Sequence, residues 1–279
     1  MAYKTILVHV DQSRHMAQRV KLAAMIARAE KAHLIGAAMT GISRFVYGND
    51  GVPPQDPTLA AHLEFLRQRA DHALAEFEAI AKLAGLDSLE KRVADDEAGS
   101  GINLLARYCD LVVIGQTDPD EPTPGVTPNF PEHVVLHCGR PVLIVPYTGH
   151  VDQVGSKVLL AWDASMEATR AVAGALPLFK RATGVEIVIF NAHASLLLPN
   201  AEPGTDIQAY LARHGIKTVL TLQKTDLDVG TALLSLASDR TSDLIVMGAY
   251  GHSRFREILL GGVTRVVLQS MTLPVLMAH

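Results

Sequence analysis

The chain has 279 residues, of which 48% are hydrophobic and 19% are charged, and its formal net charge is −4. This composition supplies enough apolar material for hydrophobic cores and excludes a disordered chain, and no apolar run reaches the roughly 18 residues that a membrane-spanning helix needs. Neither half is basic, and neither Cys109 nor Cys138 has a partner at metal-ligand spacing, which argues against nucleic acid as a partner, a zinc ribbon and a disulfide scaffold.

The first half alternates short apolar runs with stretches of helical periodicity. The opening run TILVHV at 5–10 predicts a strand that is buried on both faces. The N-terminus lacks the unbroken apolar stretch of a signal peptide, so we expect a cytoplasmic protein without a membrane partner. Further strands are expected at 32–39, 89–94, 110–115 and 141–146, and helices at 14–31, 58–84, 98–108 and 131–138.

The second half follows the same alternation. Strands are expected at 158–163, 186–192, 217–223, 243–248 and 274–278, and helices near 166–182, 205–214, 229–240 and 261–271. Strands that alternate with helices indicate right-handed βαβ units and a parallel sheet, so the predicted fold class is α/β. In such sheets, ligands bind beyond the carboxyl ends of the strands, where the strand order reverses.

The two halves are copies of one another. YCDLVVIGQT at 108–117 matches TSDLIVMGAY at 241–250, which pairs Gly115 with Gly248. The two opening strands also match, and this pairs Asp11 with Asp163. The repeat is too long for a solenoid and indicates a duplicated domain. We therefore predict domains at 1–148 and 155–279, joined by a polar linker that contains glycine.

A glycine-containing loop in the second copy attracts functional interest. Gly248 and Gly251 follow a buried strand, and Gly261 and Gly262 precede a helix. Glycines let the backbone approach a ligand closely, and the free N–H groups of a helix N-terminus favour phosphate. Thr264 in the first turn is a candidate hydroxyl donor. Glycines at these places are also explained by tight turns that bind no ligand. A ligand-binding loop and a purely structural turn therefore both remain possible explanations.

At this point the chain resembles a tandem universal stress protein over essentially its whole length. The resemblance rests on the opening strand that ends in Asp, the DLIVMG strand, the glycine loop and the closing Pro-Val-Leu strand. The ATP-binding pattern of that family is Gly, two residues, Gly, nine residues, Gly, then Ser or Thr. Gly248, Gly251 and Gly261 stand at this spacing, whereas Gly262 replaces the final hydroxyl residue.

The resemblance implies two doubly wound domains of the adenine nucleotide alpha hydrolase-like fold, each with a five-stranded parallel sheet of order 3-2-1-4-5. It implies that the closing strands of the two copies pack against each other. It also implies ATP, with Mg near Asp163, in the second copy, and a homo-oligomer or protein partner. The implied nucleotide-binding residues are Ala161, Trp162, Asp163, Asn191, Met247, Gly248, Gly251, His252, Ser253, Arg254, Gly261, Gly262, Val263 and Thr264.

The first copy departs from this pattern. Asp118 stands where the second glycine is expected, and Asp120, Glu121 and several prolines follow it. Carboxylates repel a triphosphate and prolines remove backbone N–H donors, so we expect no ATP in this copy although Asp11 is retained. The pair His133 and His137 has the i, i+4 spacing of a zinc site but no evident third ligand.

The leading hypothesis is a stress-response protein that binds ATP in its second copy. No nucleophile motif is visible, so we expect at most slow hydrolysis or autophosphorylation. One alternative is a nucleotide-independent interaction module, which the missing final hydroxyl residue and the divergent first copy favour. Another is a hydrolase of an adenosine-containing substrate, for which His252 is the candidate proton-transfer group.

Overall fold

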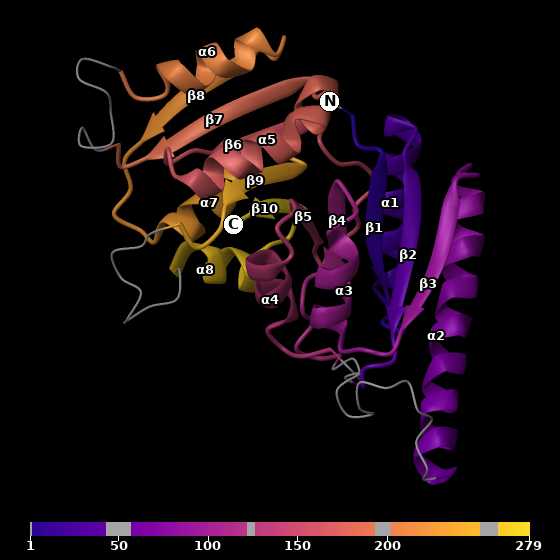
Figure 1. The fold of residues 1–279 in the computed structure, drawn as a ribbon. Coiled ribbons are helices and arrows are strands. Elements are labelled where there is room, and N and C mark those ends of the chain that lie inside the picture. The colour runs from indigo at the N-terminus through magenta and orange to yellow at the C-terminus, as the bar shows by residue number, and fades with distance from the viewer. Residues whose placement is uncertain (1, 43–56, 122–125, 193–201, 252–261) are drawn as a thin grey trace. The chain divides into compact units, whose positions relative to one another are not determined.

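The computed structural model describes residues 2–42, 57–121, 126–192, 202–251 and 262–279 (Figure 1). The described chain divides into two compact units, one before Pro141 and one from Pro141 onward. The domain limits of 1–148 and 155–279 stay a prediction beside this division. Among the described residues, no helix has both the length and the apolar character that crossing a bilayer demands.

The first unit contains the elements β1 (Thr5–Val10), α1 (Met16–Glu30), β2 (His33–Met39), α2 (Pro57–Leu83), β3 (Leu89–Ala94), α3 (Ala98–Ala106), β4 (Leu111–Gly115) and α4 (Phe130–His137). Its strands pair in the order β3-β2-β1-β4, and each pair is parallel. The observed strands match the predicted ones to within two residues. Continuous β-branched and apolar runs therefore located β1, β2 and β4 correctly, whereas β3 is the polar segment LEKRVA.

The second unit contains the elements β5 (Val142–Val145), β6 (Lys157–Ala161), α5 (Met166–Arg181), β7 (Gly184–Phe190), α6 (Thr205–Arg213), β8 (Thr218–Gln223), α7 (Val229–Asp239), β9 (Leu244–Gly248), α8 (Gly262–Ser270) and β10 (Val275–Ala278). Five strands pair in parallel in the order β8-β7-β6-β9-β10, and β5 pairs with β10 in antiparallel fashion. The order 3-2-1-4-5 and the pairing of the two closing strands are thus observed here.

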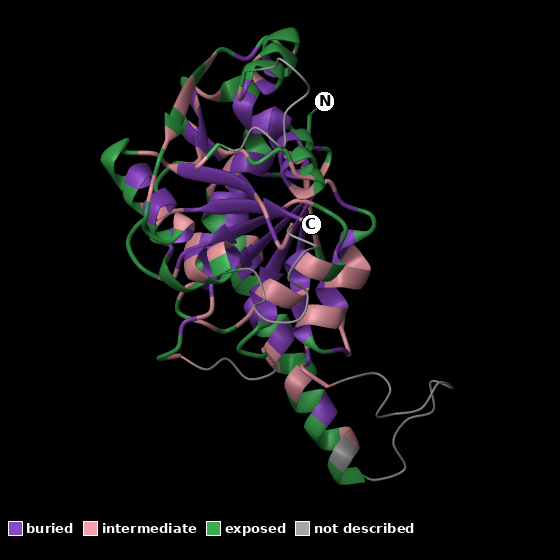
Figure 2. Ribbon diagram, turned by 90° about the vertical axis from the view of Figure 1, so that its left-hand side faces the viewer, coloured by how far each residue is buried: buried purple, intermediate pink, exposed green. Residues whose placement is uncertain are grey.

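The central strands form the cores of both units. β1, β4, β9 and β10 are almost wholly buried. Figure 2 shows that much of the strand ribbon is purple, the colour of buried residues. In the first unit α1 packs against α2, and α3 packs against α4. Because crossovers in parallel sheets are right-handed, the reversal of strand order at β1 assigns the two helix pairs to opposite faces. The fold is therefore the doubly wound α/β class that the sequence predicts.

One aspartate fixes the same strand junction in each copy. Asp110 Oδ2 accepts hydrogen bonds from the backbone N–H groups of Lys4 and Thr5 at 2.7 and 3.0 Å. Its repeat partner Asp243 accepts from the N–H groups of Ser156 and Lys157, both at 3.0 Å. These two aspartates therefore dock the start of the first strand of a copy onto the fourth.

We expect Asp243→Ala to lower the free energy of unfolding by about 2 kcal/mol, because hydrogen bonds to a charged group are lost and two backbone donors lose their acceptor. Chemical denaturation monitored by circular dichroism measures this change. Asp226→Ala, which removes an exposed carboxylate, is the matched control. Equal stability of the two variants would contradict the docking role of Asp243.

Candidate functional site

The predicted nucleotide residues gather at one edge of the second sheet. Ala161 is the last residue of β6, Asn191 follows β7, and Met247 and Gly248 end β9. β7, β6 and β9 are neighbours and run parallel, so their carboxyl ends meet at this edge. The strand order reverses at β6, which is the place where open α/β sheets bind ligands.

The turn after β6 holds Asp163 at the surface. Asp163 Oδ1 accepts a hydrogen bond from the backbone N–H of Ser165 at 3.0 Å, and the residue between them, Ala164, has a positive φ of 62°. Ser165 is the N-cap of α5, and its hydroxyl oxygen accepts from the N–H of Ala168 at 3.1 Å. The turn therefore presents an exposed carboxylate directly beyond the strand, next to the half-buried Trp162.

The two glycines after β9 allow the chain to pass close to the start of α5. A Cβ on Gly248 would lie 2.5 Å from the backbone nitrogen of Ala168, so this position accepts no side chain without a shift of the helix backbone. A Cβ on Gly251 would lie 2.8 Å from Glu167 Oε2 and 3.3 Å from Ser165 Oγ. Both glycines therefore have a packing reason, which is independent of any ligand.

The start of α8 differs in this respect. Gly262 is exposed, and none of the described atoms lies within 4 Å of a Cβ placed on it. Thr264 is buried, and its hydroxyl oxygen accepts a hydrogen bond from the backbone N–H of Tyr250 at 3.2 Å. This bond ties the loop after β9 to the first turn of α8, with Val263 half-buried between Gly262 and Thr264.

Not every predicted residue can be placed. His252, Ser253, Arg254 and Gly261 lie outside the described residues. The side chain of Asn191 bonds with Thr225: its Nδ2 donates to the carbonyl oxygen at 3.1 Å, and its Oδ1 accepts from the N–H at 3.0 Å. Asn191 thus links the ends of β7 and β8, and the assignment of nucleotide contacts to these residues stays a prediction.

The corresponding edge of the first sheet is lined by charged side chains. Asp11 is hydrogen-bonded to Ser13, and its Oδ1 lies 2.8 Å from the guanidinium of the buried Arg19. A Cβ on Gly115, which corresponds to Gly248, would lie 2.5 Å from Arg19 Nη1. The buried cation Arg19 therefore lies at the strand ends of the first copy. Burial alone would raise the pKa of Asp11, but Arg19, His9 and the hydrogen bonds from Ser13 together outweigh burial and hold the pKa below its usual range.

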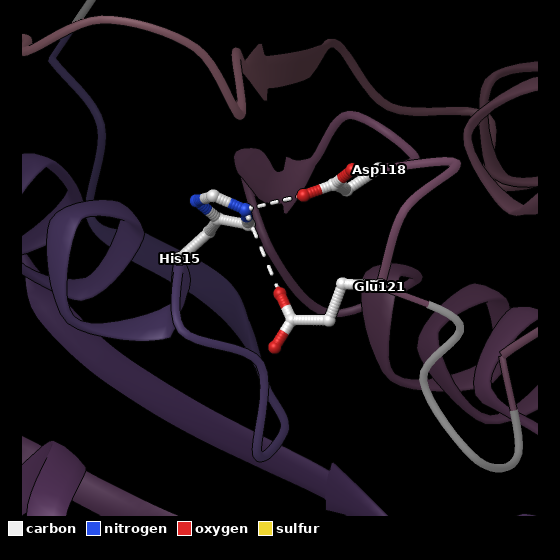
Figure 3. A group of neighbouring side chains, drawn as sticks. All are labelled: His15, Asp118 and Glu121. Atoms are coloured by element: carbon white, nitrogen blue, oxygen red, sulfur yellow. Dashed lines mark hydrogen bonds and ion pairs between the residues drawn. The ribbon is translucent and has the colours of Figure 1, made fainter.

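Two of the acidic residues after β4, Asp118 and Glu121, are paired with Arg14 and His15. Arg14 Nη2 donates to Asp118 Oδ2 at 2.6 Å, and His15 Nε2 lies 2.8 Å from the same oxygen. His15 Nε2 also lies 3.6 Å from Glu121 Oε2 (Figure 3). Burial alone would raise the pKa of Asp118, but the hydrogen bonds from His15 and Arg14 outweigh it and lower the pKa to about 2. The prediction treated these carboxylates as unpaired, because it overlooked partners more than 100 positions earlier in the chain.

A cavity of about 340 Å³ lies beside these groups in the first unit. It is bordered by the strand-end residues of β1 and β4, and its polar lining includes His9, Asp11, Arg19, His15, Asp118 and Glu121. The sequence reasoning missed His9, Arg14, His15 and Arg19. A comparison of the two copies contains the signal, because the repeat pairs His9 with Ala161 and Arg19 with Ala171.

Comparisons with known proteins agree with the duplicated fold. The model of the universal stress protein family matches residues 2–146 and again residues 156–279. The universal stress protein Slr1230 of Synechocystis sp. is 29% identical over 159 residues, which are 52% of this chain and 49% of the relative. The chain thus spans about half the length of this curated relative.

Two solved structures show the same fold along nearly the whole chain. A universal stress protein from Archaeoglobus fulgidus DSM 4304 aligns with a TM-score of 0.71 and 16% identity, covering 98% of this chain and 94% of that one. A protein of the same kind from Pseudomonas aeruginosa UCBPP-PA14 aligns with a TM-score of 0.64 and 18% identity, covering 99% and 92%.

Proposed function

Because the chain belongs to the universal stress protein family, we propose that it is a stress-response protein that binds an adenine nucleotide, ATP, in its second copy. One observation carries the proposal: the exposed carboxylate of Asp163 follows β6, and α8 begins at Gly262, where no described atom lies within 4 Å of a Cβ. Free N–H groups and the helix dipole at such a start favour phosphate.

The contrast between the copies supports a single nucleotide site. In the second copy, Ala161, Ala171 and Gly251 stand where the first copy has His9, Arg19 and Asp118. These replacements remove the buried cation and the loop carboxylate from the strand ends. We therefore propose one nucleotide per chain, with Mg near Asp163 and with hydrolysis or autophosphorylation slow at most. The cytoplasmic location and the homo-oligomer or protein partner stay predictions.

Nucleotide content is the first measurement. We expect protein purified without added nucleotide, then denatured, to release about one ATP or ADP per chain, detected by ion-exchange chromatography and mass spectrometry. If the site empties during purification, titration with ATP and magnesium should saturate at one equivalent. Two equivalents would contradict the assignment of the first copy as nucleotide-free.

An interaction module that needs no nucleotide is the second candidate. The edge strand β8 and the loop after it expose apolar side chains: Val219 is 65%, Leu222 is 54% and Leu227 is 66% exposed. An exposed apolar strand edge is a typical place for another chain to dock. No bound nucleotide and no ATP titration would favour this candidate over the first.

A further inference from the structure

Three ligand-type atoms converge at the carboxyl end of the first sheet. His15 Nε2, Asp118 Oδ2 and Glu121 Oε2 all lie within 4.8 Å of one another. Figure 3 shows the imidazole and the two carboxylates pointing toward one another, from the loop after β1 and the loop after β4. These loops are far apart in sequence and meet because β1 and β4 are parallel neighbours.

In each carboxylate, one oxygen accepts a hydrogen bond from a backbone N–H group, which orients the side chain so that the other oxygen faces the cluster. Asp118 Oδ1 accepts a hydrogen bond from the N–H of Asp120 at 2.9 Å, so its Oδ2 faces His15. Glu121 Oε1 accepts from the N–H of Arg14 at 3.1 Å, so its Oε2 faces His15 as well. The two oxygens are thus preset on one side of the imidazole.

A second observation is that two buried polar atoms in and beside this cluster make no hydrogen bond to the described residues. Glu121 Oε2 is buried and accepts no hydrogen bond from the described part of the chain; Arg14 Nε at 3.5 Å and His15 Nε2 at 3.6 Å approach it as ion pairs. In the adjoining cavity, Nδ1 of His9, whose side chain is only 2% exposed, likewise makes no hydrogen bond to described groups. Buried polar atoms of this kind normally have a partner, so they point to an additional bound group at this end of the sheet.

We propose that the first copy binds one Zn²⁺ ion through His15 Nε2, Asp118 Oδ2 and Glu121 Oε2. Tetrahedral zinc with bonds of about 2.0–2.1 Å sets neighbouring ligand atoms about 3.3 Å apart. The separations of 2.8 and 3.6 Å from His15 Nε2 bracket this value. An imidazole nitrogen favours a transition metal over Mg²⁺, and the cavity provides room for water as the fourth ligand.

Arg14 is the cation that now neutralises the cluster. Its Nη2 lies 2.6 Å from Asp118 Oδ2 and its Nε lies 3.1 Å from His15 Nε2, while 62% of its side chain is exposed. A zinc ion would displace it from these atoms without disturbing the core. Arg14 and zinc therefore compete for the same ligand atoms. If zinc binds there, removal of the Arg14 charge should raise the affinity for zinc, whereas a cluster that is only a structural ion pair predicts no such gain.

The experiment uses the full chain after treatment with a chelator and dialysis, titrated with ZnCl₂ by isothermal calorimetry. We expect one equivalent of zinc, with an affinity about tenfold or more weaker in His15→Gln and in Asp118→Asn. Arg14→Gln should bind about threefold to tenfold tighter, because it removes a competing positive charge. Co²⁺ should give a visible absorption band that is altered in His15→Gln, since the nitrogen ligand is lost.

The chain has 12 histidines, so adventitious zinc needs a matched control. His137→Gln removes one histidine of the His133 and His137 pair on α4 and should leave zinc affinity unchanged. A loss confined to His137→Gln, or equal affinity in His15→Gln and the parent chain, would overturn the proposal. Weaker binding in Arg14→Gln would also overturn it. Thermal melts identify an unfolded variant, and Glu121→Gln then replaces it in the series.

Discussion

We expect the replacement of Gly262 with aspartate to weaken nucleotide binding strongly and to leave the chain folded. The described atoms leave open space around a Cβ at this position, and a carboxylate in the first turn of a helix interacts favourably with the helix dipole. The same carboxylate faces the site proposed for phosphate. At about 5 Å and an effective dielectric constant near 20, two like charges repel by about 3 kcal/mol, which weakens binding about 100-fold or more.

ATP titration by calorimetry, together with a thermal melt, checks both halves of this expectation. Gly184→Asp is the matched control, because Gly184 also has open space around its Cβ among the described atoms but lies at the amino end of β7. Gly262→Ser restores the hydroxyl of the family pattern and should bind ATP at least as tightly as the parent. Unchanged affinity for ATP in Gly262→Asp would contradict a phosphate site at α8. A substitution at Gly248 is not a suitable test, because it would disturb the packing of the chain against α5 as well as any binding.

We expect acidification to destabilise the chain through His9. Burial lowers the pKa of His9 from 6.5 to about 4; Asp11 acts in the opposite direction and Arg19 reinforces the lowering. The folded pKa lies below the unfolded one, so the unfolded state binds more protons between these values. The stability contributed by neutral His9 is therefore present above pH 6.5 and is lost as the pH falls toward 4. Between pH 7 and pH 4.5 the loss is about 2 kcal/mol.

Urea denaturation at a series of pH values measures this loss, and His9→Gln should remove most of the slope between pH 6.5 and 4.5. His62→Gln, which removes an exposed histidine from α2, is the control. The aromatic contact of His9 with Phe130, at 4.8 Å between ring centroids, makes some loss of stability in His9→Gln expected at every pH. Parallel pH profiles for His9→Gln and the parent chain would refute the assignment to His9.

The sequence was sufficient to predict the strands because buried parallel strands are continuous apolar runs, such as TILVHV and LIVMG. The repeat then indicated which acids and glycines lie at strand ends. The sequence was not sufficient to predict how the charged side chains of the first copy pair with one another. Asp11 and Arg19 are eight positions apart, across the turn and the start of α1, and their pairing depends on how this turn folds back over β1. The pairing of His15 with Asp118 depends on the sheet order, which local patterns do not encode.

The glycine loop shows a different limit. The sequence spacing allows two explanations for Gly248: the glycine forms a turn, or it lets the backbone approach a ligand closely. Neither the spacing nor the composition distinguishes between them. The structure adds a concrete packing reason, namely the 2.5 Å approach to the backbone of α5. A residue of this kind can satisfy packing and still border a ligand, so the informative position is Gly262, where no described atom demands a glycine.

The antiparallel pairing of β5 with β10 joins the closing strands of the two sequence repeats. β10 is fully buried, and without β5 it would become an apolar sheet edge open to other chains. Residues 146–156 connect β5 to β6, which belongs to the same sheet as β10. Because this connection is short, β5 stays near β10 at an effective concentration in the millimolar range. Because both strands belong to one chain, this contact does not depend on protein concentration, and dilution cannot separate the two strands.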